Sequence, residues 1–118
     1  MVISSPWNEA NSVERWVVAG TLDDLWEGDM RSVMLDGRKI LLCNFEGAVA
    51  AYDNSCPHLG NLLSMGTLEG HVLTCAAHEW SFDVRTGGGI NPSGACLHRY
   101  PVRLEGDRVL VDTNAGDA

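Results

Sequence analysis

Short runs of β-branched and apolar residues, each ended by a turn, fill the sequence from Arg15 onward and constrain its fold most. The pair Asp36-Gly37 tolerates the positive φ of a tight hairpin, and Glu46-Gly47 forms a second turn. The runs predicted as strands cover residues 15–19, 30–35, 38–45, 48–52, 70–74, 81–84, 100–104 and 108–111. Because these runs are short and closely spaced, the sequence predicts an antiparallel all-β fold, either a sandwich or a small barrel.

Local patterns refine this expectation. A helix of one or two turns is predicted to start at Thr21, with the Thr21 hydroxyl capping the first turn and Asp24 reciprocating. Tyr100, Val102 and Leu104 alternate with polar residues, which predicts that these three side chains face the core. The segments 53–66, 75–80 and 87–96 lack a strand pattern and are predicted to be loops.

The length and charge of the chain limit its organisation and partners. At 118 residues we expect one domain over 15–112, with a loose arm at 1–14 and a tail at 113–118. The net charge of −8 disfavours nucleic-acid binding and suits brief docking onto another protein, although solvation alone explains most of it. The sequence has neither a membrane-spanning apolar run, which needs about 20 residues, nor a secretory signal. We therefore expect a cytoplasmic monomer with reduced cysteines.

Two of the predicted loops carry one cysteine and one histidine each. The first loop contains Cys56-x-His58 and the second contains Cys75-x-x-His78, with sixteen residues between the two pairs. A [2Fe–2S] cluster has two irons, each of which needs two protein ligands. A cysteine and a histidine close together on a tight turn can reach both irons. If two cysteines bind one iron and two histidines bind the other, each loop must reach both irons, and this spacing allows it.

The same four residues also allow simpler interpretations than an iron–sulfur cluster. Two cysteines and two histidines can also hold a structural zinc ion, but zinc fingers pair cysteine with cysteine and histidine with histidine. Taken singly, a loop histidine is usually solvated and a cysteine is usually a small buried residue. Cys43 is predicted to lie in the core. Cys96, His71 and His98 have no ligand spacing and are assigned no role.

The ligand pattern resembles that of the Rieske iron–sulfur proteins. The segments 75–82, 89–92, 96–97 and 100–102 are similar to the small Rieske ferredoxins of multicomponent aromatic and alkene monooxygenases, of the toluene 4-monooxygenase type. This similarity runs from about Val17 to Val111. It implies a Rieske fold with a two-loop tip, in which one [2Fe–2S] cluster is bound by Cys56, His58, Cys75 and His78.

The resemblance also implies a function. It indicates a non-catalytic carrier that takes one electron from an NADH-dependent FAD/[2Fe–2S] reductase and passes it to the di-iron hydroxylase of a hydrocarbon monooxygenase. The alternative within this class is the ferredoxin of a ring-hydroxylating dioxygenase. A fragment of a catalytic oxygenase is disfavoured, because the two spare histidines have no second domain in which to build a mononuclear iron site.

Residues around the ligands carry further expectations. Pro57, Leu59, Gly60 and Trp80 are expected to surround the histidine edge as a docking tip. The segment 87–92, which includes Pro92, either packs over the cluster or forms a simple turn.

Departures from the Rieske proteins of respiratory complexes indicate the redox class. Asn61 and Ala77 stand where those proteins carry two further cysteines, so no disulfide crosses the cluster. Trp80 and Phe82 stand where those proteins carry serine and tyrosine hydroxyls that raise the potential. We therefore expect a potential of roughly −150 mV, at the low end of the Rieske range. Such a potential suits a carrier that is reduced by a flavoprotein.

Overall fold

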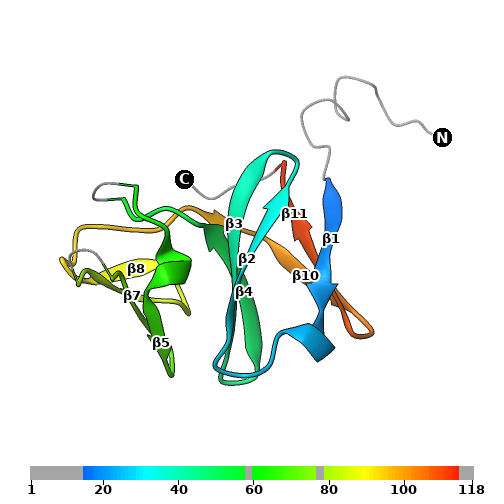
Figure 1. Cartoon of the computed structure of the whole chain (residues 1–118), viewed down its shortest axis with the longest axis horizontal. Coiled ribbons are helices and arrows are strands. Elements are labelled where there is room, and N and C mark those ends of the chain that lie inside the picture. The colour runs from blue at the N-terminus through cyan, green and yellow to red at the C-terminus, as the bar shows by residue number, and fades with distance from the viewer. Residues whose placement is uncertain (1–14, 58–59, 77–78, 115–118) are drawn as a thin grey trace.

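The computed structural model describes residues 15–57, 60–76 and 79–114, which form three antiparallel sheets (Figure 1). The first sheet has the order β1 (Trp16–Thr21), β11 (Arg108–Asp112), β10 (Val102–Glu105). The second has the order β2 (Met30–Leu35), β3 (Arg38–Phe45), β4 (Ala48–Asp53), β9 (Arg99–Tyr100). The third has the order β5 (Thr67–Glu69), β6 (Val72–Thr74), β7 (Ser81–Asp83), β8 (Gly88–Asn91). Two 3₁₀ helices, η1 (Leu22–Asp24) and η2 (Leu63–Met65), complete the described elements.

The predicted all-β fold is confirmed, including its two tight hairpins. Asp36 and Gly37 have φ angles of 50° and 77°, and Glu46 and Gly47 have φ angles of 50° and 83°. Two successive left-handed residues match the twist of the flanking strands, so β2, β3 and β4 follow one another as direct neighbours. Over the described residues, no helix has the length and apolar character needed to cross a bilayer.

Strand β3 separates two hydrophobic cores. Leu41 and Cys43 face a core that is shared with the third sheet, whereas Ile40 and Leu42 face a core that is shared with the first sheet. All four side chains are at most 1% exposed. The unbroken apolar run of β3 therefore reflects burial on both faces of the second sheet. The third sheet packs on one face of the second sheet, and the first sheet lies on its other face (Figure 1).

The predicted strand 100–104 is wrong in one respect, because the chain forms two strands in different sheets. β9 pairs with β4 in the second sheet, and β10 pairs with β11 in the first. Pro101 lies between them and lacks the backbone N–H that would continue a ladder. The chain changes sheets at this proline. Leu104 shares a face of β10 with Val102, which packs against the core, but Leu104 lies near the end of the strand and is 47% exposed.

Two local predictions also need correction. The segment 87–96, predicted as a loop, contains β8, which pairs with β7 through its backbone. A side chain at Gly89 would overlap the Pro92 carbonyl oxygen, so the close approach of these two backbone segments requires glycine. Glycine has a low strand propensity, which is why the sequence does not predict this strand. The helix predicted at Thr21 is the single turn η1. The Thr21 hydroxyl contacts the Asp24 carboxylate at 3.4 Å and does not cap a backbone N–H.

Candidate metal centre

The first cysteine lies in the connection between β4 and β5, which we call the first loop (residues 54–66). Cys56 is 1% exposed. Its N–H donates to the Asn61 carbonyl oxygen at 2.7 Å, and its own carbonyl accepts from the N–H of Gly60 at 2.7 Å. Gly60 has a φ of 77°, which lets the chain reverse direction there. The two hydrogen bonds therefore close a short arch over residues 56–61.

The second cysteine lies in the connection between β6 and β7, the second loop (residues 75–80), which has the same hydrogen bonds. The Cys75 N–H donates to the Trp80 carbonyl oxygen at 2.7 Å, and the Cys75 carbonyl accepts from the N–H of Glu79 at 3.0 Å. Glu79 has a φ of 59°, at the position that Gly60 occupies in the first loop. Both cysteines thus begin arches of the same geometry. In each arch the cysteine backbone is hydrogen-bonded to the residues four and five positions further along the chain.

These matching arches fit the ligand set of a Rieske cluster. Cys56 and Cys75 lie in the same buried core group, between the second and third sheets. His58 and His78 lie outside the described residues, and in the sequence each falls within one of the two arches. Two buried thiols at equivalent turns, each followed by an imidazole, suit cysteine ligation of one iron and histidine ligation of the other. Within the described ranges, no group of three or more His, Cys, Asp or Glu side chains could hold a metal ion elsewhere.

The other cysteines and histidines have different surroundings. Cys43 lies in the core as predicted, and burial raises the pKa of its thiol to about 12, so it stays protonated at neutral pH. Cys96 is an exposed free cysteine. His71 Nδ1 lies 3.0 Å from a Glu46 carboxylate oxygen, and the His98 ring stacks edge-on against Tyr100.

The residues predicted to form a docking tip differ in exposure. Pro57 and Gly60 are exposed beside Cys56. Trp80 is only partly exposed, because it packs against the core group that contains Cys75. Pro92 is also partly exposed, and Leu59 lies outside the described residues.

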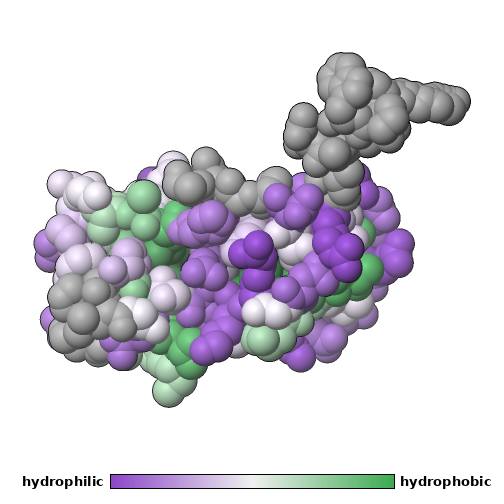
Figure 2. Space-filling view, turned by 90° about the horizontal axis from the view of Figure 1, so that it is seen from above, coloured by the Kyte–Doolittle hydropathy of each residue, from purple (hydrophilic) through white to green (hydrophobic). Residues whose placement is uncertain are grey.

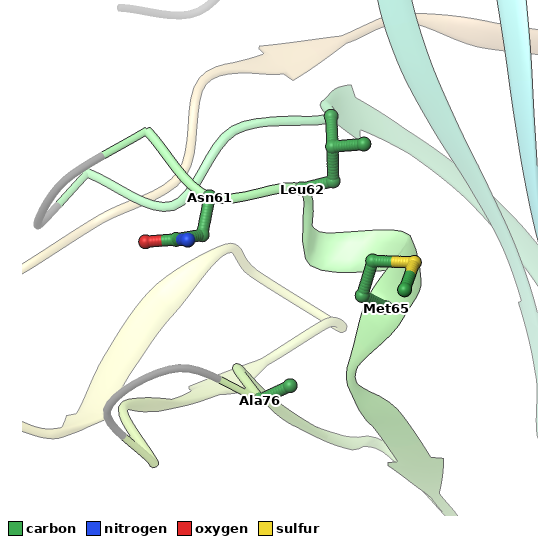
Figure 3. A pocket seen from close by; sticks show the side chains of 4 residues that line it. All are labelled: Asn61, Leu62, Met65 and Ala76. Carbon is green, nitrogen blue, oxygen red and sulfur yellow. The ribbon is translucent and has the colours of Figure 1, made fainter.

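A hollow of about 400 Å³ lies between the two loops (Figure 3). Asn61, Leu62 and Met65 line it from the first loop, and Ala76 lines it from the second. Met65 is 72% exposed and Leu62 is 39% exposed. The surface next to the two arches is therefore largely apolar.

Sequence reasoning missed Asn54, which precedes the first arch. This side chain is fully buried, and its Nδ2 donates to the hydroxyls of Ser32 at 3.1 Å and Ser64 at 3.0 Å. Its Oδ1 accepts from the Ser64 N–H at 2.9 Å, and its backbone N–H donates to the Lys39 carbonyl at 2.9 Å. Asn54 thereby joins the two ends of the first loop to each other and to the second sheet.

Asn54→Ala should loosen the first loop, because it leaves two hydroxyls and one N–H without their buried partner. We expect a loss of about 2 kcal/mol of stability and faster loss of the cluster on warming. The measurement follows visible absorbance and far-UV circular dichroism during heating. Asn61→Ala is the matched control, since Asn61 lies in the same loop with an exposed side chain. Equal rates of cluster loss in the two variants would contradict the role assigned to Asn54.

A family model describes this combination of fold and loops. The model of the Rieske [2Fe-2S] domain matches residues 15–101. The chain belongs to the Rieske [2Fe-2S] domain family. The match spans both loops and all strands from β1 to β9, so the family assignment and the predicted fold agree.

Rieske ferredoxins are also the relatives of the chain. The ferredoxin component of the alkene monooxygenase system of Xanthobacter autotrophicus is 41% identical, covering 96% of this chain and 93% of the relative. The ferredoxin component of the naphthalene 1,2-dioxygenase system of Pseudomonas aeruginosa is 38% identical, covering 84% and 96%. A solved complex of reduced oxygenase and oxidized ferredoxin in carbazole 1,9a-dioxygenase contains a chain that is 27% identical. It matches with a TM-score of 0.76, over 82% of this chain and 92% of that one.

These matches place the chain among the Rieske ferredoxins of oxygenase systems. Such a ferredoxin is an electron carrier and not a catalytic subunit, as the sequence predicted. A Rieske [2Fe-2S] domain implies one Rieske cluster.

Proposed function

We propose that Cys56 and Cys75 bind one iron of the cluster and that His58 and His78 bind the other. The matching arches and the burial of both thiols support this assignment. When bound, the cluster supplies a reversible one-electron change. The protein holds the two cysteines at equivalent positions and shields their sulfur atoms from water.

We propose further that this ferredoxin carries electrons from an NADH-dependent flavoprotein reductase to the di-iron hydroxylase of an aromatic or alkene monooxygenase. The observation that carries this proposal is the 41% identity to an alkene monooxygenase ferredoxin over almost the full length of both chains. The oxidised cluster with its two thiolates has no formal charge, so reduction adds only one negative charge to the protein. A small change in charge suits a carrier that cycles repeatedly.

The surroundings of the loops support a low potential. Phe82 is fully buried and has no hydroxyl to donate. The Tyr52 hydroxyl already donates to the Val84 carbonyl oxygen at 2.7 Å. Hydrogen bonds to sulfur raise the potential of a cluster, so their absence at these two side chains favours a value of roughly −150 mV.

A dioxygenase ferredoxin is the second candidate. Identity of 38% to a naphthalene dioxygenase ferredoxin and the TM-score of 0.76 to the carbazole dioxygenase complex favour it. The two candidates share the cluster and the electron donor. They differ in the acceptor, which is a di-iron hydroxylase in one case and an oxygenase with a Rieske cluster and mononuclear iron in the other.

We propose that residues 15–112 act as one domain, and that the protein works as a monomer in the cytoplasm. Hydrogen bonds join the two ends of this segment. The Arg15 N–H donates to the Asp112 carboxylate at 3.0 Å, and the Thr113 N–H donates to the Arg15 carbonyl at 3.0 Å. We also propose that Pro57, Leu59 and Gly60 contact the partner proteins directly. Trp80 and Pro92 are partly buried and are proposed to pack behind these three contact residues.

Electron delivery tests the proposed acceptor. The ferredoxin, reduced by NADH and the flavoprotein reductase of the same organism, should restore hydrocarbon oxidation by the purified di-iron hydroxylase. We expect at least a tenfold increase in product over a mixture that lacks ferredoxin. A dioxygenase component from the same organism serves as the comparison. Faster product formation with the dioxygenase than with the hydroxylase would overturn the monooxygenase assignment.

A further inference from the structure

Three of the cationic side chains make no polar contact within the described part of the chain. Contacts to a carboxylate or a carbonyl oxygen are made by Arg15, Arg31, Arg85, Arg103 and Arg108. Arg38, Lys39 and Arg99 form no side-chain hydrogen bond or ion pair with the described residues. Hydrogen bonds from Arg15 and Thr113 lower the pKa of Asp36, and the nearby charge of Arg38 adds to this effect without a direct contact.

These three cations lie at one end of the second sheet. Arg38 and Lys39 begin β3, and Arg99 lies opposite Tyr52, next to the last residue of β4. The first loop starts at this same end, where the Asn54 N–H donates to the Lys39 carbonyl. Three of the four cations without an ion pair among the described residues therefore lie beside the loop that carries Cys56, and the fourth, Arg31, contacts the Asp24 carbonyl oxygen.

A cleft of about 270 Å³ opens between the start of β3, with Arg38 and Lys39, and the first loop. Arg38, Lys39 and Asp53 line it from the sheet, and Gly60 and Leu62 line it from the loop. Leu62 also lines the apolar hollow of Figure 3, so the two depressions adjoin. Figure 2 shows hydrophilic residues gathered over the middle of the face that includes the β2–β3 turn.

The opposite end of the second sheet is acidic. Asp23, Asp24, Glu27 and Asp29 lie around η1, and the Gly28 N–H donates to the Asn44 carbonyl near the far end of β3. A chain with a net charge of −8 thus carries three cations without a polar contact to the described residues beside the first loop, and a group of carboxylates at the other end. An acidic partner attracts the cationic end and repels the acidic end. The ferredoxin therefore approaches such a partner with its first loop facing it.

We propose that the cleft and the adjoining hollow dock an acidic surface of the flavoprotein reductase, a carboxylate meeting Arg38 and Lys39 and an apolar side chain meeting Leu62 and Met65. This inference rests on the proposed function. Reduction adds one negative charge near the first loop, so an acidic surface binds the oxidised ferredoxin more tightly than the reduced form. Such a preference suits the electron donor, which must take up the oxidised carrier and release the reduced one. The acceptor requires the opposite preference.

The test measures the KM of the purified reductase for oxidised ferredoxin in NADH-driven reduction, together with the salt dependence of that KM. Lys39→Glu and Arg38→Glu should each raise KM about tenfold at low salt with little change in kcat. Arg31→Glu changes the net charge equally, but the Arg31 side chain contacts the Asp24 carbonyl oxygen at the acidic end and does not line the cleft, so this variant should change KM less than twofold. Leu62→Ala should raise KM several-fold without altering the salt dependence. Cluster content, measured by visible absorbance, ensures that only loaded ferredoxins are compared.

Two results would overturn the docking proposal. One is an equal effect of Arg31→Glu and Lys39→Glu, which would indicate a response to net charge alone. The other is a tenfold effect of Lys39→Glu on KM for reduced ferredoxin at the hydroxylase, with no effect at the reductase. Failure of the wild-type ferredoxin to accept electrons from the reductase would instead contradict the proposed function.

Discussion

Ferredoxin in which His58 or His78 is replaced by alanine is expected to be purified without a [2Fe–2S] cluster. Each histidine is proposed to supply one of the two protein ligands of a single iron. Loss of either one leaves that iron open to water and to exchange. We expect iron and acid-labile sulfide to fall by more than tenfold per chain. Far-UV circular dichroism should retain its β-sheet signal, because the two hydrophobic cores are built from other residues.

Residues of the same type outside the arches provide the controls. Cys75→Ser should lose the cluster as the histidine variants do, whereas Cys96→Ser and His98→Ala should keep it. Reduced wild-type protein should give an electron paramagnetic resonance spectrum with a mean g below that of four-cysteine clusters. A four-cysteine spectrum, or iron and sulfide retained in both histidine variants, would contradict the ligand assignment. Colourless wild-type protein that contains zinc would favour the structural zinc site.

Features set by neighbouring residues were predictable from the sequence. The hairpin at Asp36-Gly37 follows from the φ preferences of two adjacent residues. The double burial of β3 follows from its unbroken apolar run. The two Cys/His pairs were recognisable because each pair lies within one short turn.

Features set by distant backbone were not predictable in the same way. β8 contains two glycines with little strand propensity, and it forms because β7 offers an unpaired edge. A simple alternation of residues shows neither the change of sheet at Pro101 nor the 47% exposure of Leu104 near the end of β10. Asn54 is an ordinary turn residue in the sequence, and its importance depends on Ser32, which lies 22 residues earlier.

Gly66 is another residue whose role depends on a distant contact, and its replacement by alanine should be strongly destabilising. A Cβ at this position would overlap the Thr74 carbonyl oxygen and lie 3.0 Å from the Thr74 carbonyl carbon and 3.3 Å from the Ala76 nitrogen. The end of the first loop therefore packs directly on the backbone that flanks Cys75. The obstructing atoms belong to the backbone of Thr74 and Ala76, which relaxes far less readily than the end of a flexible side chain.

We expect Gly66→Ala to cost about 3 kcal/mol and to lower the melting temperature by roughly 10 °C or more, as measured by far-UV circular dichroism. The peptide that joins Thr74 to Cys75 must shift to admit the new methyl group, so cluster content should fall as well. Gly94→Ala is the control, because a Cβ there meets nothing within 4 Å. A general effect of glycine replacement would lower the stability of both variants equally. Loss of stability and of iron in Gly66→Ala alone would instead show that close contact between the two loops positions Cys75. A fully loaded Gly66→Ala protein with an unchanged melting temperature would contradict this contact.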